Sequence, residues 1–392
     1  MTATAVIARR GAERVRAGHP WVYRSDVIEA NADPGDLARV STDHGRFVGW
    51  AFFSAASQIT LRFISTRKEP PDDRALIKDR LDEAARFRAS LAIDATAFRL
   101  LHGEADRLPA TIVDQYGDET GTYFVVQTLS QAADRRLALL CDLLVEQFNP
   151  RGVLARNDPK VRELEGLPRQ VDVLYGQVPE RVVVREGLVR YAADLRAGQK
   201  TGLFLDQREN HAAAAGYARG DVLDAFTYHG GFALQMAPRA ASVLALDSSE
   251  AAAAATVDNA RANGLGNVIV RAVNVFDELR ELEIAGTSFD TVVLDPPAFA
   301  KNRGAVERAL AGYKEINLRA LRLLRPGGYL LTCSCSYNVD EALFLETVRQ
   351  AAVDAPASVS LVEKRLQARD HPVLVGVPET YYLKCLVLRK LA

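Results

Sequence analysis

The first 70 residues alternate short apolar runs with turn residues. The strand-like runs WVYRSDV, LARVST, RFVGWAFF and QITLRFIS are separated by NADPGD and DHG. Short β-type runs bounded by Gly, Pro, Asp and Asn are typical of a small β-barrel or sandwich. We therefore predict a β-domain over residues 1–70, followed by the linker KEPPDD.

Residues 74–182 mix the two periodicities. RALIKDRLDEAARFRASL and DRRLALLCDLLVEQF place apolar residues at helical spacing. The segments ATIVDQYG, TYFVVQTL and RGVLAR between and after them are strand-like. This pattern predicts a central α+β domain.

From residue 185 to residue 392, buried strands alternate with helices. The apolar runs VLDAF, SVLALD, NVIVRAV, TVVLD and GYLLTCS are separated by helical segments such as SSEAAAAATVDNARANG. Such βαβ repetition predicts a parallel, doubly wound, Rossmann-like sheet. The last runs, VSLVEKRL and YYLKCLVLRKL, have no full helix between them, and we expect an antiparallel hairpin at the sheet edge.

Composition excludes several classes of protein. Of the 392 residues, 48% are hydrophobic and 25% are charged, as in soluble globular chains. A net charge of −1 does not suit coating of nucleic acid by bulk charge. We find no apolar run of membrane-spanning length and no signal-peptide pattern. Four cysteines are too few for a disulfide framework, which favours a cytoplasmic protein.

A glycine-bearing turn follows the first strand of the C-terminal sheet. In LDAFTYHGGF, Gly230 and Gly231 would let the backbone approach a ligand without a Cβ collision. Asp247 ends the next strand, about 20 residues later, where an acid can bind a ribose diol. The same aspartate also suits a helix N-cap. The pattern predicts a ligand at the carboxyl edge of the sheet, and a turn without a ligand is the alternative.

The fourth strand ends in DPPAFAK, at residues 295–301. Pro296 and Pro297 fix the backbone after Asp295 and remove donors, so that nearby carbonyls can accept hydrogen bonds from amino groups of a ligand. Asp-Pro-Pro also occurs in turns without function. Its place after a buried strand, in register with the glycine turn, favours a functional loop.

Two cysteines, Cys333 and Cys335, lie near the end of the fifth strand. Strand alternation would point both the same way. No second Cys pair follows and the six histidines are scattered, so the pattern does not predict a metal site. A disulfide between residues i and i+2 would be strained. We interpret one thiol as a nucleophile, the alternative being two small residues that fill space.

Read in order, these motifs resemble class I S-adenosylmethionine-dependent methyltransferases. More specifically, they resemble bacterial 23S ribosomal RNA cytosine-5 methyltransferases with an N-terminal PUA domain. The resemblance extends over essentially the whole chain and rests on GHPWVYRSDV, RLPATIVDQYGD, GQKTGLFLDQREN, LDPPAFAK, GYKEINLRAL and LLTCSCS. It implies a PUA-like RNA-binding domain at 1–70, a central α+β domain at 74–182 and a methyltransferase domain at 185–392.

The resemblance also implies a cofactor site for S-adenosylmethionine. Phe226, Tyr228 and Gly230 would line its methionine side, Asp247 would hold the ribose and Asn274 would meet the adenine. The family usually has Asp at the position of Asn274, and Asn keeps a carbonyl acceptor. The full set of cofactor-binding residues implied is Asp224, Phe226, Tyr228, Gly230, Asp247, Asn274 and Asp295.

For catalysis, the resemblance implies that Cys335 attacks C6 of cytosine and that Asp295 interacts with N3. Cys333 is the weaker candidate. Many RNA cytosine-5 methyltransferases have a second Cys where this chain has Ala298, and the ribosomal subfamily that it resembles also lacks it. The base that removes the C5 proton is therefore unidentified.

The implied partner is ribosomal RNA, 23S in particular, with no metal and no membrane, and a homodimer stays open. Five arginines near the N-terminus, interleaved with His19, Trp21 and Tyr23, suit RNA contact, although we expect Trp21 itself to pack in the core; they are Arg9, Arg10, Arg14, Arg16 and Arg24. Two alternative functions are a guanine N-methyltransferase acting on ribosomal RNA and a non-catalytic RNA-binding ribosome-assembly factor.

Overall fold

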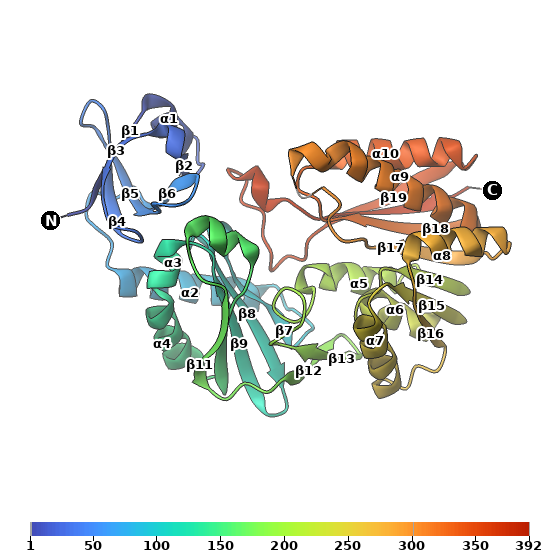
Figure 1. The fold of residues 1–392 in the computed structure, drawn as a ribbon. Coiled ribbons are helices and arrows are strands. Elements are labelled where there is room, and N and C mark those ends of the chain that lie inside the picture. The colour runs from blue at the N-terminus through green and yellow to red at the C-terminus, as the bar shows by residue number, and fades with distance from the viewer. Residues whose placement is uncertain (1, 301, 392) are drawn as a thin grey trace. The chain divides into compact units, whose positions relative to one another are not determined.

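The computed structural model describes residues 2–300 and 302–391, so Lys301 of the DPPAFAK motif lies outside the described residues. The chain divides into two compact units (Figure 1). The first contains residues 1–184 together with residues 193–203 and 370–380. The second contains residues 185–192, 204–369 and 381–392.

The first unit begins with a six-stranded, mostly antiparallel sheet and one short helix. Its strand order is β2-β6-β5-β4-β1-β3, in which only β1 and β4 are parallel. The elements are β1 (Thr4–Ile7), α1 (Arg9–Arg16), β2 (Trp21–Tyr23), β3 (Val27–Asn31), β4 (Leu37–Thr42), β5 (Phe47–Phe53) and β6 (Ile59–Ser65). Ile7, Val22, Val40 and Leu61 form its core. The β-domain expected from the turn-punctuated runs is therefore present.

The same unit continues with a five-stranded sheet of order β11-β10-β9-β8-β7. Ile77, Leu81 and Leu144 from its helices pack on Val113 and Phe124 of the sheet. The α+β pattern thus forms one layer of helices on one sheet. The elements are α2 (Asp73–Ser90), β7 (Ala97–His102), β8 (Thr111–Asp118), β9 (Gly121–Thr128), α3 (Gln131–Arg135), α4 (Leu137–Phe148), β10 (Gly152–Asn157) and β11 (Gln170–Gly176).

A buried carboxylate joins the two sheets of the first unit. Glu165, in the short 3₁₀ helix Lys160–Glu165, is 1% exposed. Its Oε1 accepts a hydrogen bond from Arg62 at 2.8 Å, and its Oε2 accepts one from Ser54 Oγ at 2.5 Å. A buried charge is costly unless it is paired in this way, so these contacts fix the N-terminal sheet on the central one.

The hairpin β12 (Arg181–Glu186) and β13 (Val189–Asp194) follows. Strand β12 includes residues 182 and 185, between which the sequence places the boundary of the C-terminal domain. The division into three domains at 70, 74, 182 and 185 therefore stays a prediction.

The second unit contains a seven-stranded sheet of order β16-β15-β14-β17-β18-β20-β19. Strands β14 to β18 are parallel, and β20 runs antiparallel to both of its neighbours. The order reverses at β14, so the loops after β14 and β17 meet at a topological switch point, where doubly wound folds bind ligands. The expected edge pair β19 and β20 is present. The strands are β14 (Asp221–Ala225), β15 (Ser242–Asp247), β16 (Val268–Ala272), β17 (Phe289–Leu294), β18 (Leu324–Ser334), β19 (Val359–Leu366) and β20 (Lys384–Lys390).

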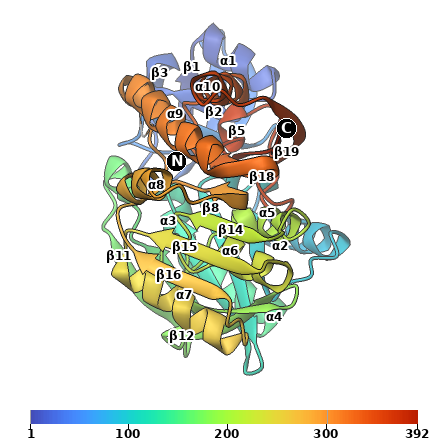
Figure 2. The ribbon, with the colours of Figure 1, turned by 90° about the vertical axis from the view of Figure 1, so that its right-hand side faces the viewer.

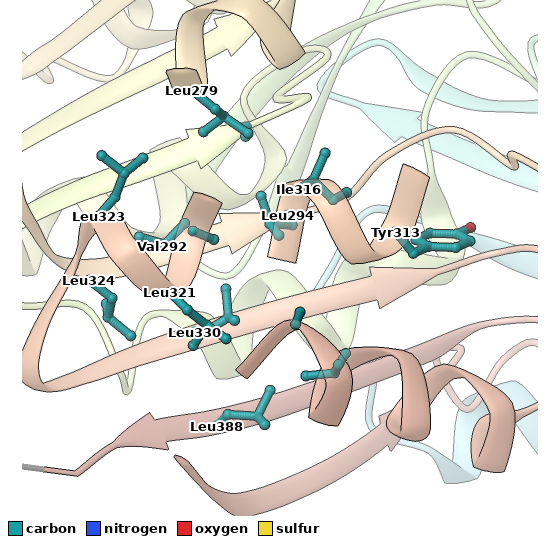
Figure 3. Close-up of a cluster of buried hydrophobic side chains, with 14 of the residues drawn as sticks. Leu279, Val292, Leu294, Tyr313, Ile316, Leu321, Leu323, Leu324, Leu330 and Leu388 are labelled. Atoms are coloured by element: carbon teal, nitrogen blue, oxygen red, sulfur yellow. The ribbon is translucent and has the colours of Figure 1, made fainter. Parts of the chain in front are cut away.

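Helices cover both faces of this sheet (Figure 2). They are α5 (Arg208–Ala214), α6 (Gly231–Met236), α7 (Glu250–Ala262), α8 (Val275–Ile284), α9 (Val306–Leu323) and α10 (Glu341–Asp354). Alternate strand residues face opposite layers: Leu223 packs with α8, α9 and α10, whereas Val222 packs with α5 and α6. Figure 3 shows the first of these cores, where Ile316 and Leu321 of α9 meet Val292 and Leu330 of the sheet.

No helix in the described part of the chain is long and apolar enough to cross a membrane.

Candidate active site

The turn after β14 has an unusual backbone. The backbone φ values of Phe226, Tyr228 and Gly230 are 70°, 51° and 86°. They lie in the left-handed region that residues other than glycine rarely adopt. The turn is held by carboxylates: Asp247 Oδ2 accepts from Tyr228 N at 2.9 Å, and Asp224 Oδ2 accepts from Thr227 Oγ1 at 2.6 Å. Strain of this kind persists where the surroundings over-determine it and is frequent at functional sites.

The two glycines of this turn make room for the protein's own side chains. A Cβ on Gly230 would lie 2.9 Å from Leu234 Cγ, and one on Gly231 would lie 2.5 Å from the His211 ring. Packing of the turn on α5 and α6 therefore requires glycine at both positions. The approach of a ligand to this backbone stays a prediction.

Asp224, the last acid of β14, lies at the bottom of the turn. Its carboxylate is fully buried, and burial raises its pKa to about 6. One oxygen, Oδ2, accepts from Thr227 and from Ala233 N, whereas Oδ1 has no hydrogen-bond partner within the described structure. A buried acceptor left in this state normally has a partner that is not part of the chain.

Asp247 and Asn274 both precede helices at the carboxyl edge of the sheet. Asp247 Oδ1 accepts from Ser249 N at 2.9 Å, while its other oxygen holds Tyr228. Asn274 precedes α8, and its Oδ1 accepts from Phe276 N at 3.0 Å. The N-cap of α7 is Ser249, whose Oγ accepts from Ala252 N at 3.2 Å, so the helix-cap interpretation of Asp247 is wrong. Each oxygen of Asp247 keeps a lone pair for a ligand hydroxyl.

Asp295 follows β17 directly and touches the neighbouring loop. Its backbone N donates to Ala225 O at 3.3 Å, and its Oδ1 accepts from Gln207 Nε2 at 2.8 Å. Burial raises its pKa to about 7, and the negative charges of Asp206 and Asp224 act in the same direction, against the opposing effect of His211. A carboxyl with this pKa is present in both protonation states near neutrality.

The two cysteines, which strand alternation would point the same way, have different surroundings. Cys333 lies inside β18, is fully buried and stands opposite Cys385 of β20. Burial raises the pKa of the Cys333 thiol well above its ordinary value. Cys335 lies one residue beyond the strand, is partly exposed and has its Sγ 3.9 Å from Pro296 O. Only Cys335 combines exposure with contact to the Asp-Pro-Pro loop.

A hydroxyl network supports the loop and the cysteine segment together. The Tyr313 hydroxyl lies 3.0 Å from Ser334 Oγ and 2.9 Å from Ser336 Oγ. Ser336 Oγ also accepts from Ala300 N at 3.2 Å. Because these residues lie on both sides of Cys335 and at the end of the 295–300 loop, the network fixes the position of the thiol relative to Asp295.

Comparison with known proteins agrees with this geometry. Residues 169–389 match a family model described as S-adenosylmethionine-dependent methyltransferase, and residues 6–66 match one described as a PUA-like domain. This chain belongs to the S-adenosylmethionine-dependent methyltransferase family. Two observations establish the family: the match to the family model, and relatives whose matches cover 99% of the chain.

Two such relatives are the proteins named ribosomal RNA large subunit methyltransferase I of Aliivibrio fischeri and Vibrio cholerae. They are 36% and 37% identical to this chain, and the matches cover 99% of this chain and 100% of each relative. Among solved structures, that of SMU.776 in complex with SAH has a TM-score of 0.85 at 20% identity over 99% of this chain and 100% of its own. The fold of this methyltransferase is therefore that of its family, with an N-terminal PUA-like domain.

The residues at the carboxyl edge fit S-adenosylmethionine, the cofactor of this family. The buried Oδ1 of Asp224 offers an unused acceptor, and the two oxygens of Asp247 keep lone pairs suited to the hydroxyls of a ribose. Asn274 is exposed after the next strand, and its carbonyl oxygen, which accepts one hydrogen bond in the helix cap, keeps a second lone pair for an amino group of the adenine.

Sequence reasoning missed three residues of this site. Gln207 belongs to the quoted segment GQKTGLFLDQREN and His211 directly follows it, but the motif did not show that Gln207 donates to Asp295 or that His211 packs under Gly231. His211 is oriented by Glu186, whose Oε2 lies 3.1 Å from Nδ1. The third, Lys384, lies on β20 far along the chain. Within the described residues, no cluster of three or more His, Cys, Asp or Glu side chains could hold a metal ion.

The N-terminal arginines are used within their own domain more than the sequence suggested. Arg10 and Arg14 both pair with Asp26, which is 2% exposed, at 2.5 and 2.7 Å. Arg24 donates to the carbonyls of residues 55 and 56. Arg9 and Arg16 lie exposed on α1. Trp21, expected in the core, is only half-buried, and its Nε1 donates to Glu104 at 3.0 Å.

Proposed function

We propose that this methyltransferase modifies ribosomal RNA of the large subunit and that it forms 5-methylcytosine through a covalent adduct of Cys335. The full-length match to relatives named ribosomal RNA large subunit methyltransferase I supports the substrate. The observation that carries the chemistry is the partly exposed Cys335 thiol beside the loop of Asp295.

Cytosine C5 is a poor nucleophile, and a thiolate overcomes this. When Cys335 forms an S–C6 bond, the electron pair of the C5–C6 double bond moves into the ring and N3 takes up a proton. C5 of the resulting enamine is nucleophilic. The cofactor supplies an electrophilic methyl group when bound. Once C5 carries the methyl group, a base removes the C5 proton, and the electron pair of that C–H bond forms the C5–C6 double bond as the C6–S bond breaks and releases the thiolate. N3 then gives back its proton.

Asp295 suits the proton transfer at N3. Its carboxyl, with a pKa raised to about 7 by burial, holds a proton in part of the molecules at neutral pH. A protonated carboxyl can donate to N3 as the adduct forms and take the proton back on release. The base for the C5 proton stays unassigned, since Ala298 stands where many relatives of other branches have a second Cys.

We propose that the PUA-like domain holds RNA next to the target. Arg9 and Arg16 lie exposed on α1, where Arg9 forms a surface ion pair with Glu13 at 2.7 Å that a phosphate can replace, and Tyr23 is half-buried on β2. With a net charge of −1 for the whole chain, such contacts must come from local groups. This assignment rests on the domain match and on the exposure of these side chains.

The chemistry is tested with RNA that contains 5-fluorocytosine at the target position. Fluorine does not leave as a cation, so the adduct should remain covalent and appear by mass spectrometry on the peptide of Cys335. The Cys335→Ser variant should form no adduct and lose methyl transfer by orders of magnitude, while cofactor and RNA binding persist. Cys333→Ser is the matched control, because its thiol is buried and should matter little.

Two results would overturn the proposal. A cross-link through Cys333 would show that the wrong thiol has been assigned. Methylation at the wild-type rate without either thiol would remove covalent C5 chemistry and favour a guanine N-methyltransferase, whose ring nitrogen needs no activation. Mapping of 5-methylcytosine in ribosomal RNA from cells with and without this protein identifies the nucleotide.

A further inference from the structure

Lys384 is a buried lysine next to the proposed nucleophile. It begins β20, and its side chain is 1% exposed. Its Nζ donates to Ser336 O at 2.7 Å and to Tyr382 O at 2.9 Å. Ser336 directly follows Cys335, so the ammonium is hydrogen-bonded to the segment that contains the thiol.

The hydrogen bonds of this ammonium leave its charge uncompensated. Both acceptors are neutral carbonyl oxygens. The acids nearest in electrostatic effect are Asp340 and Glu341, and both have other partners: Asp340 caps α10 through Leu343 N, and Glu341 pairs with Lys364 at 2.6 Å. An ammonium buried in this way is costly unless a negative charge forms beside it.

We propose that Lys384 is a positioning residue that stabilises the thiolate form of Cys335 and holds the backbone of residues 335 and 336 in place. The proposal rests on the proposed function in one respect, namely that Cys335 is the nucleophile. It assigns to β20 a role in the reactivity of a thiol on another strand.

The electrostatics support the geometry. Burial lowers the pKa of Lys384 to about 8, and among the charges that oppose this effect the Cys335 thiolate comes first, before Asp340 and Glu341. Coupling between two sites is reciprocal, so a thiolate that favours the ammonium is itself favoured by it. Below about pH 8 the ammonium is charged and the thiolate is stabilised, and above it this support is lost.

The test measures how alkylation of Cys335 depends on pH, without RNA or cofactor. Iodoacetamide reacts with the thiolate, which displaces iodide and becomes a thioether, and the rate is read from the mass of the peptide that contains Cys335. The other cysteines, Cys141, Cys333 and Cys385, are buried and are followed separately on their own peptides. The midpoint of the rate against pH reports the thiolate population.

Lys384→Gln removes the charge and keeps an amide donor on a side chain that is one bond shorter. We expect its alkylation midpoint to rise by about one pH unit, so that the rate below both midpoints falls about tenfold. Lys384→Arg retains the charge, so its alkylation midpoint should stay close to that of the wild-type protein. A midpoint equal to that of the wild-type protein in a folded Lys384→Gln variant would overturn the proposal.

Lys390 provides a matched control on the same strand. Its Nζ also donates to two backbone carbonyls, Leu321 O and Leu324 O, both at 2.7 Å, at the other end of β20. Lys390→Gln should lower thermal stability without moving the Cys335 midpoint. An equal midpoint shift in Lys390→Gln would show a general structural effect and overturn the assignment. Failure of the fluorocytosine adduct would instead contradict the proposed function while leaving the alkylation profile unchanged.

Discussion

At the scale of single residues, the site separates groups of the same type by their surroundings. Cys333 and Cys335 differ by two positions, yet one thiol is buried opposite Cys385 and the other is partly exposed beside Pro296. Asp224 and Asp247 are both strand-end acids, but only Asp224 is fully buried, and its pKa is raised to about 6. Chemical role here follows from desolvation and hydrogen bonding rather than residue type.

Asp295 should make methylation depend on pH. Because its pKa is raised to about 7 by burial, its protonated form is lost as the pH rises through 7, and we expect the rate to fall on that side once the thiolate has formed. Asp295→Asn cannot transfer a proton, so the rate should be low at every pH and this limb should vanish. Single-turnover methylation between pH 5 and 9 tests this expectation.

The same residue should reduce stability at high pH. A carboxyl with a pKa of about 7 when folded and about 4 when unfolded favours the folded state most at low pH, and this contribution is lost as the pH rises from 4 to 7. Asp295→Asn should therefore be more stable than the wild-type protein at pH 8, by up to about 4 kcal/mol, and equally stable near pH 4. Denaturant titration at both values checks this, and an equal difference at both would contradict it.

Asp247 should contribute both to cofactor binding and to the shape of the turn. Its carboxylate holds Tyr228 N and Ser249 N, so Asp247→Ala removes a ligand acceptor and loosens the backbone. We expect cofactor affinity to fall about ten- to hundredfold, equivalent to about 1.5–3 kcal/mol. Calorimetry measures it. Asp258→Ala, an exposed acid on α7, is the control and should bind normally; unchanged binding in Asp247→Ala would remove it from the site.

At the scale of elements, α1 divides its arginines between structure and solvent. Arg10 and Arg14 neutralise the buried Asp26, whereas Arg9 and Arg16 project outward. Replacing Arg10 and Arg14 by neutral residues would leave the buried carboxylate of Asp26 without its partners and destabilise the fold. A loss of RNA binding in such a variant could not be assigned to a lost RNA contact. The exposed pair gives the cleaner test of the proposed RNA role.

We expect the double variant Arg9→Ala and Arg16→Ala to weaken RNA binding and flatten its salt dependence. Each lost phosphate contact should change the log–log slope by about 0.7–0.9. Fluorescence anisotropy at several salt concentrations measures the slope. Cofactor affinity and thermal stability should stay as in the wild-type protein, and an unchanged slope would contradict RNA contact through α1.

At the scale of the whole molecule, the proposed cofactor residues all belong to the second unit, while the PUA-like match lies in the first. The relatives match the chain over its full length, so both units are common to them. Binding and chemistry are thus assigned to different units of one chain, and their contributions can be measured separately.

We expect S-adenosylhomocysteine to slow hydrogen exchange only in the second unit. At one hundred times its dissociation constant, a ligand of the folded state adds about 2.7 kcal/mol of stability. The protected peptides should contain residues 222–230, 246–250 and 272–276, which include the turn and the two helix caps. Mass spectrometry should show no change over residues 6–66, and protection there would contradict this division.

Much of this protein is determined by its sequence alone. The period of apolar residues distinguished the β-domain, the α+β segment and the doubly wound sheet, because secondary structure and burial follow from local periodicity. The strand-end positions of Asp247 and Asp295 were predictable for the same reason, since parallel strands place their carboxyl ends together. The family motifs added the cofactor.

The surroundings of the individual site residues were decided by the tertiary structure alone. Lys384 lies 49 positions from Cys335 along the chain, and only the pairing of β20 with β18 brings its ammonium to the residue after that thiol. In the same way, the β-domain's Asp26 recruits two arginines that the sequence assigned to RNA. Desolvation and non-local hydrogen bonds depend on which segments meet in the fold, and a linear pattern does not contain that information.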